Sequence, residues 1–153
     1  IVAYNYGARQ PRRILRAIQL SVIYATAIML LGLLAFQLIP QVFLSIFMSE
    51  GASGDMLSIG VPALRIISLS FVFAGFGIVC SSVFQALGHG VLSLLVSLVR
   101  QLIVLLPATW ALSLIGPNAI WWAFPIAEIV SLTICLLLYR KCDRELIAPL
   151  PEE

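Results

Sequence analysis

Long apolar runs alternate with short polar segments along the chain, and four of the runs are long enough to be helices that cross a bilayer. They cover residues 14–39, 57–87, 91–115 and 120–139. About 20 predominantly apolar residues are enough to span the hydrocarbon core as a helix. The runs do not alternate between apolar and polar positions, as the strands of a membrane barrel do. The pattern therefore predicts an all-α fold, a polytopic bundle of four transmembrane helices.

Prolines and small residues subdivide these runs. Pro40 ends or kinks the first helix, and the residues after it can form one more short helical stretch. The second run is longer than a straight crossing requires, so we expect a tilted helix or a protruding end, with Pro62 in its first turns. Small residues recur in this run and offer a face on which another helix can pack: Ser68, Gly75, Ser82 and Ala86.

Composition supports the same class of protein. The 153 residues are 61% hydrophobic and 10% charged, with a mean hydropathy of +1.08, whereas a soluble domain is roughly 45 to 50% apolar and 25% charged. The sequence therefore predicts an integral membrane protein. Cys80, Cys135 and Cys142 lie in or beside apolar runs without metal-ligand spacing, so we interpret them as small core residues. No phosphate loop or nucleophile constellation supports an enzyme, and no motif indicates a cofactor.

Basic residues gather near the two ends of the chain, in the connector 1–13 and its edge and in the tail 140–153: Arg9, Arg12, Arg13, Arg16, Arg140, Lys141 and Arg144. With four crossings both ends lie on one side, and the positive-inside bias predicts that this side is cytoplasmic, in a bacterial inner membrane or a plasma membrane. We interpret the N-terminal arginines as headgroup anchors rather than contacts to nucleic acid. The segment from Asp143 to Glu153 is expected to be a short solvated end. Because the chain opens at Ile1 without an initiator methionine, we expect it to be part of a longer protein.

Three ionisable residues lie within the apolar runs: Arg65, Arg100 and Glu128. A charge at the centre of a membrane helix costs at least roughly 2.5 to 3.5 kcal/mol, so each should face a partner or a wet cavity. From the helical rise of about 1.5 Å per residue, Arg100 lies about 14 Å and Glu128 about 17 Å from the inner ends of their helices. Arg65 and Glu128 also lie at equal depths when depth is measured from the outer ends of their helices. Depth therefore leaves both pairings open.

The charges share their helix faces with polar residues and lie near prolines. Two stripes follow helical spacing: Ser93, Ser97, Arg100, Val104 and Pro107, and Trp121, Phe124, Glu128, Ser131 and Cys135. Pro107 and Pro125 each leave a backbone carbonyl unbonded four residues earlier, and such a carbonyl needs an internal partner or cavity water. This combination predicts interior, partly wet helix faces.

A carboxylate in such surroundings can bind a cation, or bind and release a proton when its access to water changes. Glu128 is therefore a candidate ion or substrate site, and Trp121 and Phe124 could offer aromatic faces to a lipophilic cation. The alternative for Glu128 is a permanent structural pairing with an arginine. Gln85 and Gln101 are interpreted first as interhelical hydrogen-bond formers, with Gln101 also a candidate contact.

Several segments resemble a known transporter family in their order along the chain. The run Tyr4-Asn5-Tyr6-Gly7-Ala8-Arg9 resembles a loop that recurs in the multidrug and toxic compound extrusion (MATE) transporters. Later segments are similar to the C-terminal lobe of that family: Ser81-Ser-Val-Phe-Gln-Ala-Leu-Gly88, Ser97-Leu-Val-Arg-Gln101 with Pro107, and Ala123-Phe-Pro-Ile-Ala-Glu128. The resemblance covers essentially the whole chain.

The resemblance implies that these are four helices of a twelve-helix transporter whose N-terminal part is missing. It implies export of drugs and organic cations by alternating access, in exchange for Na+ or H+, with the lipid bilayer as surroundings. Family members differ in which acidic residue couples the ion. Two alternatives remain: a flippase of lipid-linked oligosaccharides with related architecture, and a non-transporting four-helix membrane subunit that binds a partner through its small-residue face.

Overall fold

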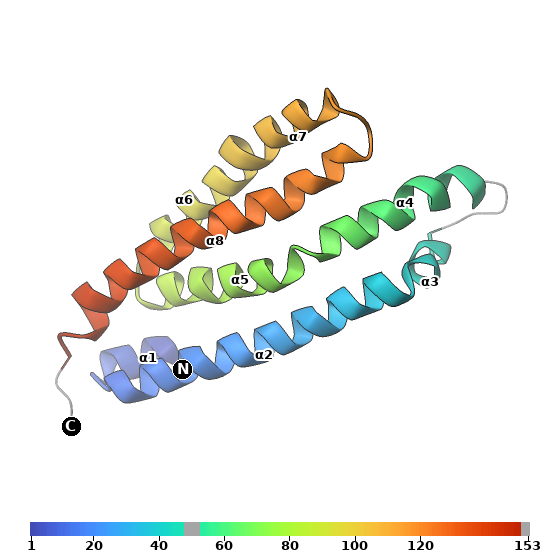
Figure 1. The fold of residues 1–153 in the computed structure, drawn as a ribbon. Coiled ribbons are helices and arrows are strands. Elements are labelled where there is room, and N and C mark those ends of the chain that lie inside the picture. The colour runs from blue at the N-terminus through green and yellow to red at the C-terminus, as the bar shows by residue number, and fades with distance from the viewer. Residues whose placement is uncertain (48–52, 151–153) are drawn as a thin grey trace.

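The computed structural model describes residues 1–47 and 53–150, and that part of the chain is a bundle of helices without a strand (Figure 1). The α-helices are α1 (Val2–Gly7), α2 (Pro11–Leu38), α3 (Pro40–Ser45), α4 (Ser53–Ser68), α5 (Phe71–Ala86), α6 (Gly90–Leu98), α7 (Leu106–Ser113) and α8 (Ala123–Cys142). Two π-helical segments, η1 (Val99–Leu105) and η3 (Asp143–Ile147), and a 3-10 helix, η2 (Ala119–Trp122), continue these helices.

Three continuous helical segments are long and apolar enough to cross a membrane: Pro11–Leu38, Gly90–Ser113 and Ala119–Ile147. The bent pair Met56–Ser68 and Phe71–Ala86 qualifies as a fourth span if it is counted as one. The start of α2 and the end of α8 lie at the same end of the bundle in Figure 1. The all-α, polytopic membrane architecture predicted from the apolar runs is thus confirmed.

The range 57–87, expected as one long helix, is two helices that meet at an angle of 52°. At the junction the backbone N–H of Leu69 bonds to the carbonyl of Ile66 at 3.2 Å, and that of Ser70 bonds to the carbonyl of Ile67 at 3.0 Å. These bonds reach back three residues instead of four, so the turn is tighter than an α-helical turn. The straight helix ends there because its ladder of hydrogen bonds is interrupted.

Side-chain hydrogen bonds replace the ladder at this break. The hydroxyl of Ser68 donates to the carbonyl of Arg65 at 2.9 Å, and that of Ser70 donates to the carbonyl of Ile67 at 2.6 Å. From α2, the amide Nε2 of Gln37 donates to the Arg65 carbonyl at 2.8 Å and to the Ser68 hydroxyl at 3.1 Å. In a membrane such partners are needed because lipid cannot satisfy a free carbonyl.

The expected position of Pro62 was also wrong. Because α4 already begins at Ser53, Pro62 lies inside the helix rather than in its first turn. The small-residue face does pack against another helix, as predicted for Gly75: a Cβ built there would lie 2.8 Å from Cγ of Met29 on α2. Ser82, two turns further along that face, is exposed.

The apolar core lies where α2, α5 and α8 meet. Ile14 of α2, Phe84 of α5 and Cys135 of α8 are completely buried in it. The C-terminal tail contributes as well, because Ile147 of η3 is only 1% exposed and belongs to the same cluster. The expectation of a solvated tail was therefore wrong at this residue, whose apolar side chain covers the end of the core. At the other terminus, the polar connector contains the short helix α1.

Candidate functional site

An ion pair lies inside the bundle. Nη1 of Arg100 donates a hydrogen bond to Oε1 of Glu128 at 2.8 Å. The side chain of Arg100 is 36% exposed and that of Glu128 is 16% exposed. The structure thus brings together one of the two pairs that depth allowed. The side chain of Arg65, on α4, is exposed and has no ion-pair partner among the side chains of residues 1–47 and 56–150.

The two charges come from neighbouring helices whose local geometry follows from prolines. Arg100 lies in the π-helical segment η1, which ends two residues before Pro107. Because Pro107 has no N–H and its ring crowds the carbonyl four residues earlier, a wider turn directly before it relieves the clash. Glu128 lies in the first turns of α8, which contain Pro125 and follow the 3-10 helix η2. The sequence therefore places a distorted helical segment beside each charge.

Arg100 also lines a polar pocket of about 240 Å³ between α5, α6 and α8. Its polar walls are mostly hydroxyl groups and one amide: Ser81, Ser82, Gln85, Ser93, Ser97 and Ser131. The amide of Gln85 donates to the hydroxyl of Ser93 at 3.0 Å, which confirms Gln85 as an interhelical hydrogen-bond former. We call this cavity the serine-lined pocket.

The chemistry of the serine-lined pocket complements the ion pair. Hydroxyl and amide oxygens accept hydrogen bonds from water or coordinate a small cation. The guanidinium of Arg100 has five N–H donors, and one of them is used by Glu128. The arrangement can therefore hold water next to the guanidinium of Arg100, which in turn binds the Glu128 carboxylate.

The remaining candidate residues lie outside this pocket. Gln101, the neighbour of Arg100 in η1, is exposed, and its side chain makes no hydrogen bond to any residue in the described ranges. Trp121 in η2 and Phe124 in α8 are partly buried. None of these three lines the serine-lined pocket. The interpretation of Gln101 as an interhelical hydrogen-bond former was therefore wrong among the described residues, because its side chain lies at an exposed position and finds no polar partner on another helix there. The roles of all three residues in binding stay predictions.

Two residues with clear contacts were not recognised from the sequence. Ser81 lines the pocket from α5, and Gln37 reaches the break between α4 and α5 from α2. A glutamine within an otherwise apolar helix was the available signal for Gln37, because lipid-facing positions rarely carry an amide. For Ser81 the signal was its place next to Ser82, one turn before Gln85.

The fold and the ion pair define a polytopic integral membrane protein with polar groups between its helices, and comparison with known proteins identifies its family. A family model described as MatE matches residues 1–110, so the chain belongs to this family, which is the one suggested by its sequence motifs. It is similar in fold to a solved structure described as the "inward-facing conformation of a multidrug resistance MATE family transporter of the MOP superfamily". The TM-score is 0.78 at 22% identity.

That similarity covers 99% of this chain and 35% of the solved transporter chain. The chain thus spans about a third of the length of the protein it resembles. No curated protein matches it significantly.

Proposed function

We propose that the chain forms part of a cation-coupled antiporter that exports drugs and organic cations by alternating access, with Na+ or H+ as the coupling ion. The observation that carries the proposal is the Arg100–Glu128 pair at the edge of the serine-lined pocket, in a member of the MatE family. In this proposal the other helices of the transporter complete the cavity around the substrate.

Glu128 acts as an exchange site in this mechanism. Its carboxylate is held by Arg100 in one state and takes up a proton or a small cation in the other. Uptake removes the attraction between the two side chains, and Arg100 then turns toward the hydroxyl groups of the serine-lined pocket. Because an ion pair in low-dielectric surroundings is much stronger than one in water, its loss can shift the balance between two packings of the helices. Phe124, one turn before Glu128, is proposed to face a lipophilic cation.

A flippase of lipid-linked oligosaccharides is less well supported. An anionic pyrophosphate calls for several cationic groups around the substrate. Among the residues that line the serine-lined pocket, Arg100 is the one cation, and it is already paired with Glu128. Arg65 lies on a different helix and does not line this pocket.

The test is dye efflux from cells that produce the full-length protein, with membrane abundance measured in parallel. We expect Glu128→Gln to abolish efflux at unchanged abundance. The matched control is Glu145→Gln, an equal charge change at an exposed position in η3, which should leave efflux intact.

A double variant distinguishes coupling from a structural role. The double variant Arg100→Gln/Glu128→Gln removes both charges together. If the pair only stabilises the fold, efflux and abundance in the double variant should be higher than in either single variant. If Glu128 couples the ion, the double variant stays inactive at normal abundance. Normal efflux by Glu128→Gln alone would refute the assignment of this residue.

A further inference from the structure

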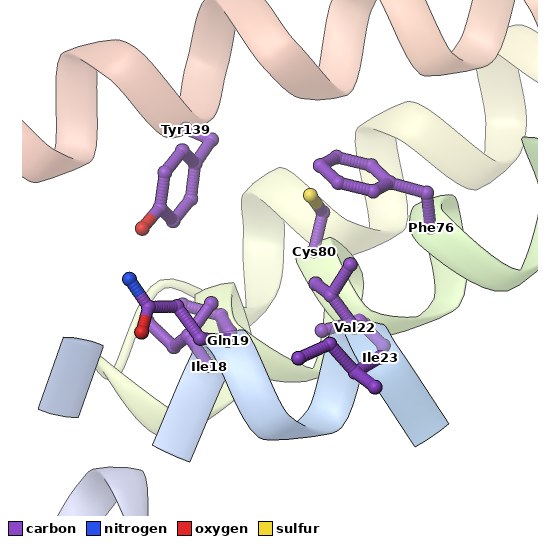
Figure 2. A pocket seen from close by; sticks show the side chains of 9 residues that line it. Ile18, Gln19, Val22, Ile23, Phe76, Cys80 and Tyr139 are labelled. Atoms are coloured by element: carbon purple, nitrogen blue, oxygen red, sulfur yellow. The ribbon is translucent and has the colours of Figure 1, made fainter. Parts of the chain in front are cut away.

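An apolar groove of about 380 Å³ lies between α2, α5 and α8, away from the serine-lined pocket. Its walls are apolar side chains of α2 and α5, among them Val22, Ile23, Phe76 and Val79. We call it the α2–α8 groove. Figure 2 shows Phe76 and Cys80 on one side of it and Val22 and Ile23 on the other.

The walls of the groove are apolar apart from the Gln19 amide and the Tyr139 hydroxyl. A flexible hydrocarbon chain fits an apolar channel between helices, and in a membrane such chains are the solvent.

One end of the groove is polar. Gln19 of α2 and Tyr139 of α8 both line the groove, and Figure 2 shows the Gln19 amide and the Tyr139 hydroxyl pointing toward one another across it. A phenol and an amide at the edge of an apolar channel are typical of the boundary between hydrocarbon and headgroups.

The same end of the bundle is cationic. Arg16 lies one turn before Gln19 on the same face of α2, and its side chain is exposed. Arg140 follows Tyr139 on α8 and is exposed as well. Positive charge at the mouth of an apolar groove complements the phosphate of an anionic lipid.

We propose that the α2–α8 groove binds one anionic phospholipid. An acyl chain lies against Val22, Ile23 and Phe76, and the phosphate accepts hydrogen bonds from Gln19, Tyr139 and Arg16. This lipid site is separate from the Arg100–Glu128 pair and does not depend on the transport proposal.

The experiment is native mass spectrometry of the purified full-length protein with phosphatidylglycerol or phosphatidylcholine added. We expect phosphatidylglycerol to be retained about fivefold more strongly, and Arg16→Gln to remove this preference. Lys141→Gln is the matched control, since it removes one charge at the same end of α8 but two positions from Tyr139, on another face.

A second pair of variants tests the groove itself. Ile23→Trp fills the groove from α2 and should lower retention of both lipids. Ile28→Trp is the control on the same helix, because the two isoleucines are similarly exposed, at 61% and 66%, and Ile28 does not line the groove. The proposal is overturned if neither lipid is retained, as when another part of the protein covers the groove. The proposal is also overturned if Arg16→Gln and Lys141→Gln lose the preference for phosphatidylglycerol to the same extent.

Discussion

The break between α4 and α5 receives two hydrogen bonds from one glutamine of another helix, so Gln37→Leu is an informative perturbation. The substitution removes the hydrogen bonds from Nε2 to the Arg65 carbonyl at 2.8 Å and to the Ser68 hydroxyl at 3.1 Å. Leucine is apolar, ends one bond earlier than glutamine and offers no donor. The Arg65 carbonyl then depends on the Ser68 hydroxyl alone.

The expected cost follows from these two bonds. Interhelical hydrogen bonds in membrane proteins average about 0.6 kcal/mol and reach about 1.7 kcal/mol. Two of them give about 1 kcal/mol, with about 3 kcal/mol as the upper bound. We expect the lower figure, because the Ser68 hydroxyl still satisfies the carbonyl.

The assay is unfolding of the purified protein in mixed micelles with increasing dodecyl sulfate, followed by circular dichroism. Gln101→Leu is the control, since this glutamine also lies in an apolar helix but makes no side-chain hydrogen bond within the described ranges. Replacing an amide by leucine favours transfer into the membrane in both variants. The difference between them therefore isolates the two hydrogen bonds of Gln37.

Two results would refute this reasoning. One is an equal change of unfolding free energy in Gln37→Leu and Gln101→Leu. The other is additivity with Ser68→Ala, because residues that share a hydrogen bond should show a coupling energy in a double-mutant cycle.

Two further predictions concern packing. Gly75→Val should lower the unfolding free energy by about 1 to 3 kcal/mol, because the Cβ of the valine would meet the Met29 side chain. Gly77→Val is the control, since nothing lies within 4 Å of a Cβ built at Gly77, and the same assay should show a smaller loss. Ile147→Ala should cost about 2 kcal/mol or more, since this tail residue is 1% exposed in the core. A solvated tail would instead give no change in unfolding and rapid hydrogen exchange throughout η3.

The lengths of the apolar runs predicted the architecture, because crossing a bilayer imposes a minimum length on any helix. Depth along each helix placed Arg100 and Glu128 at the same level, and the structure pairs them. Depth could not exclude Arg65 as the partner of Glu128, because depth gives the position of a residue along the membrane normal and not its position in the membrane plane. The choice depends on which helices are neighbours and on which face each charge lies, and those are properties of the packed bundle.

The break at Leu69 and Ser70 was missed for a related reason. A serine in a membrane helix can bond to its own backbone without bending the helix, as Ser21 does with the carbonyl of Ala17 at 2.9 Å. The 52° bend becomes recognisable only when Gln37 is found opposite it. The local sequence contains the two serines of the break, whereas Gln37 comes from another helix about 30 residues earlier in the chain.

The ion pair also fixes how the last two spans can move relative to each other. Gly90–Ser113 and Ala119–Ile147 are joined covalently through a short turn that contains Gly116. Arg100 and Glu128 join them a second time, about 20 Å from Ser113 at the helical rise. Two helices held at two separated points cannot rotate about their own axes independently. The ion pair therefore opposes rotation of the two spans relative to each other while both charges are present. Once either charge is neutralised, apolar packing such as that of Cys135 in the core still holds α8.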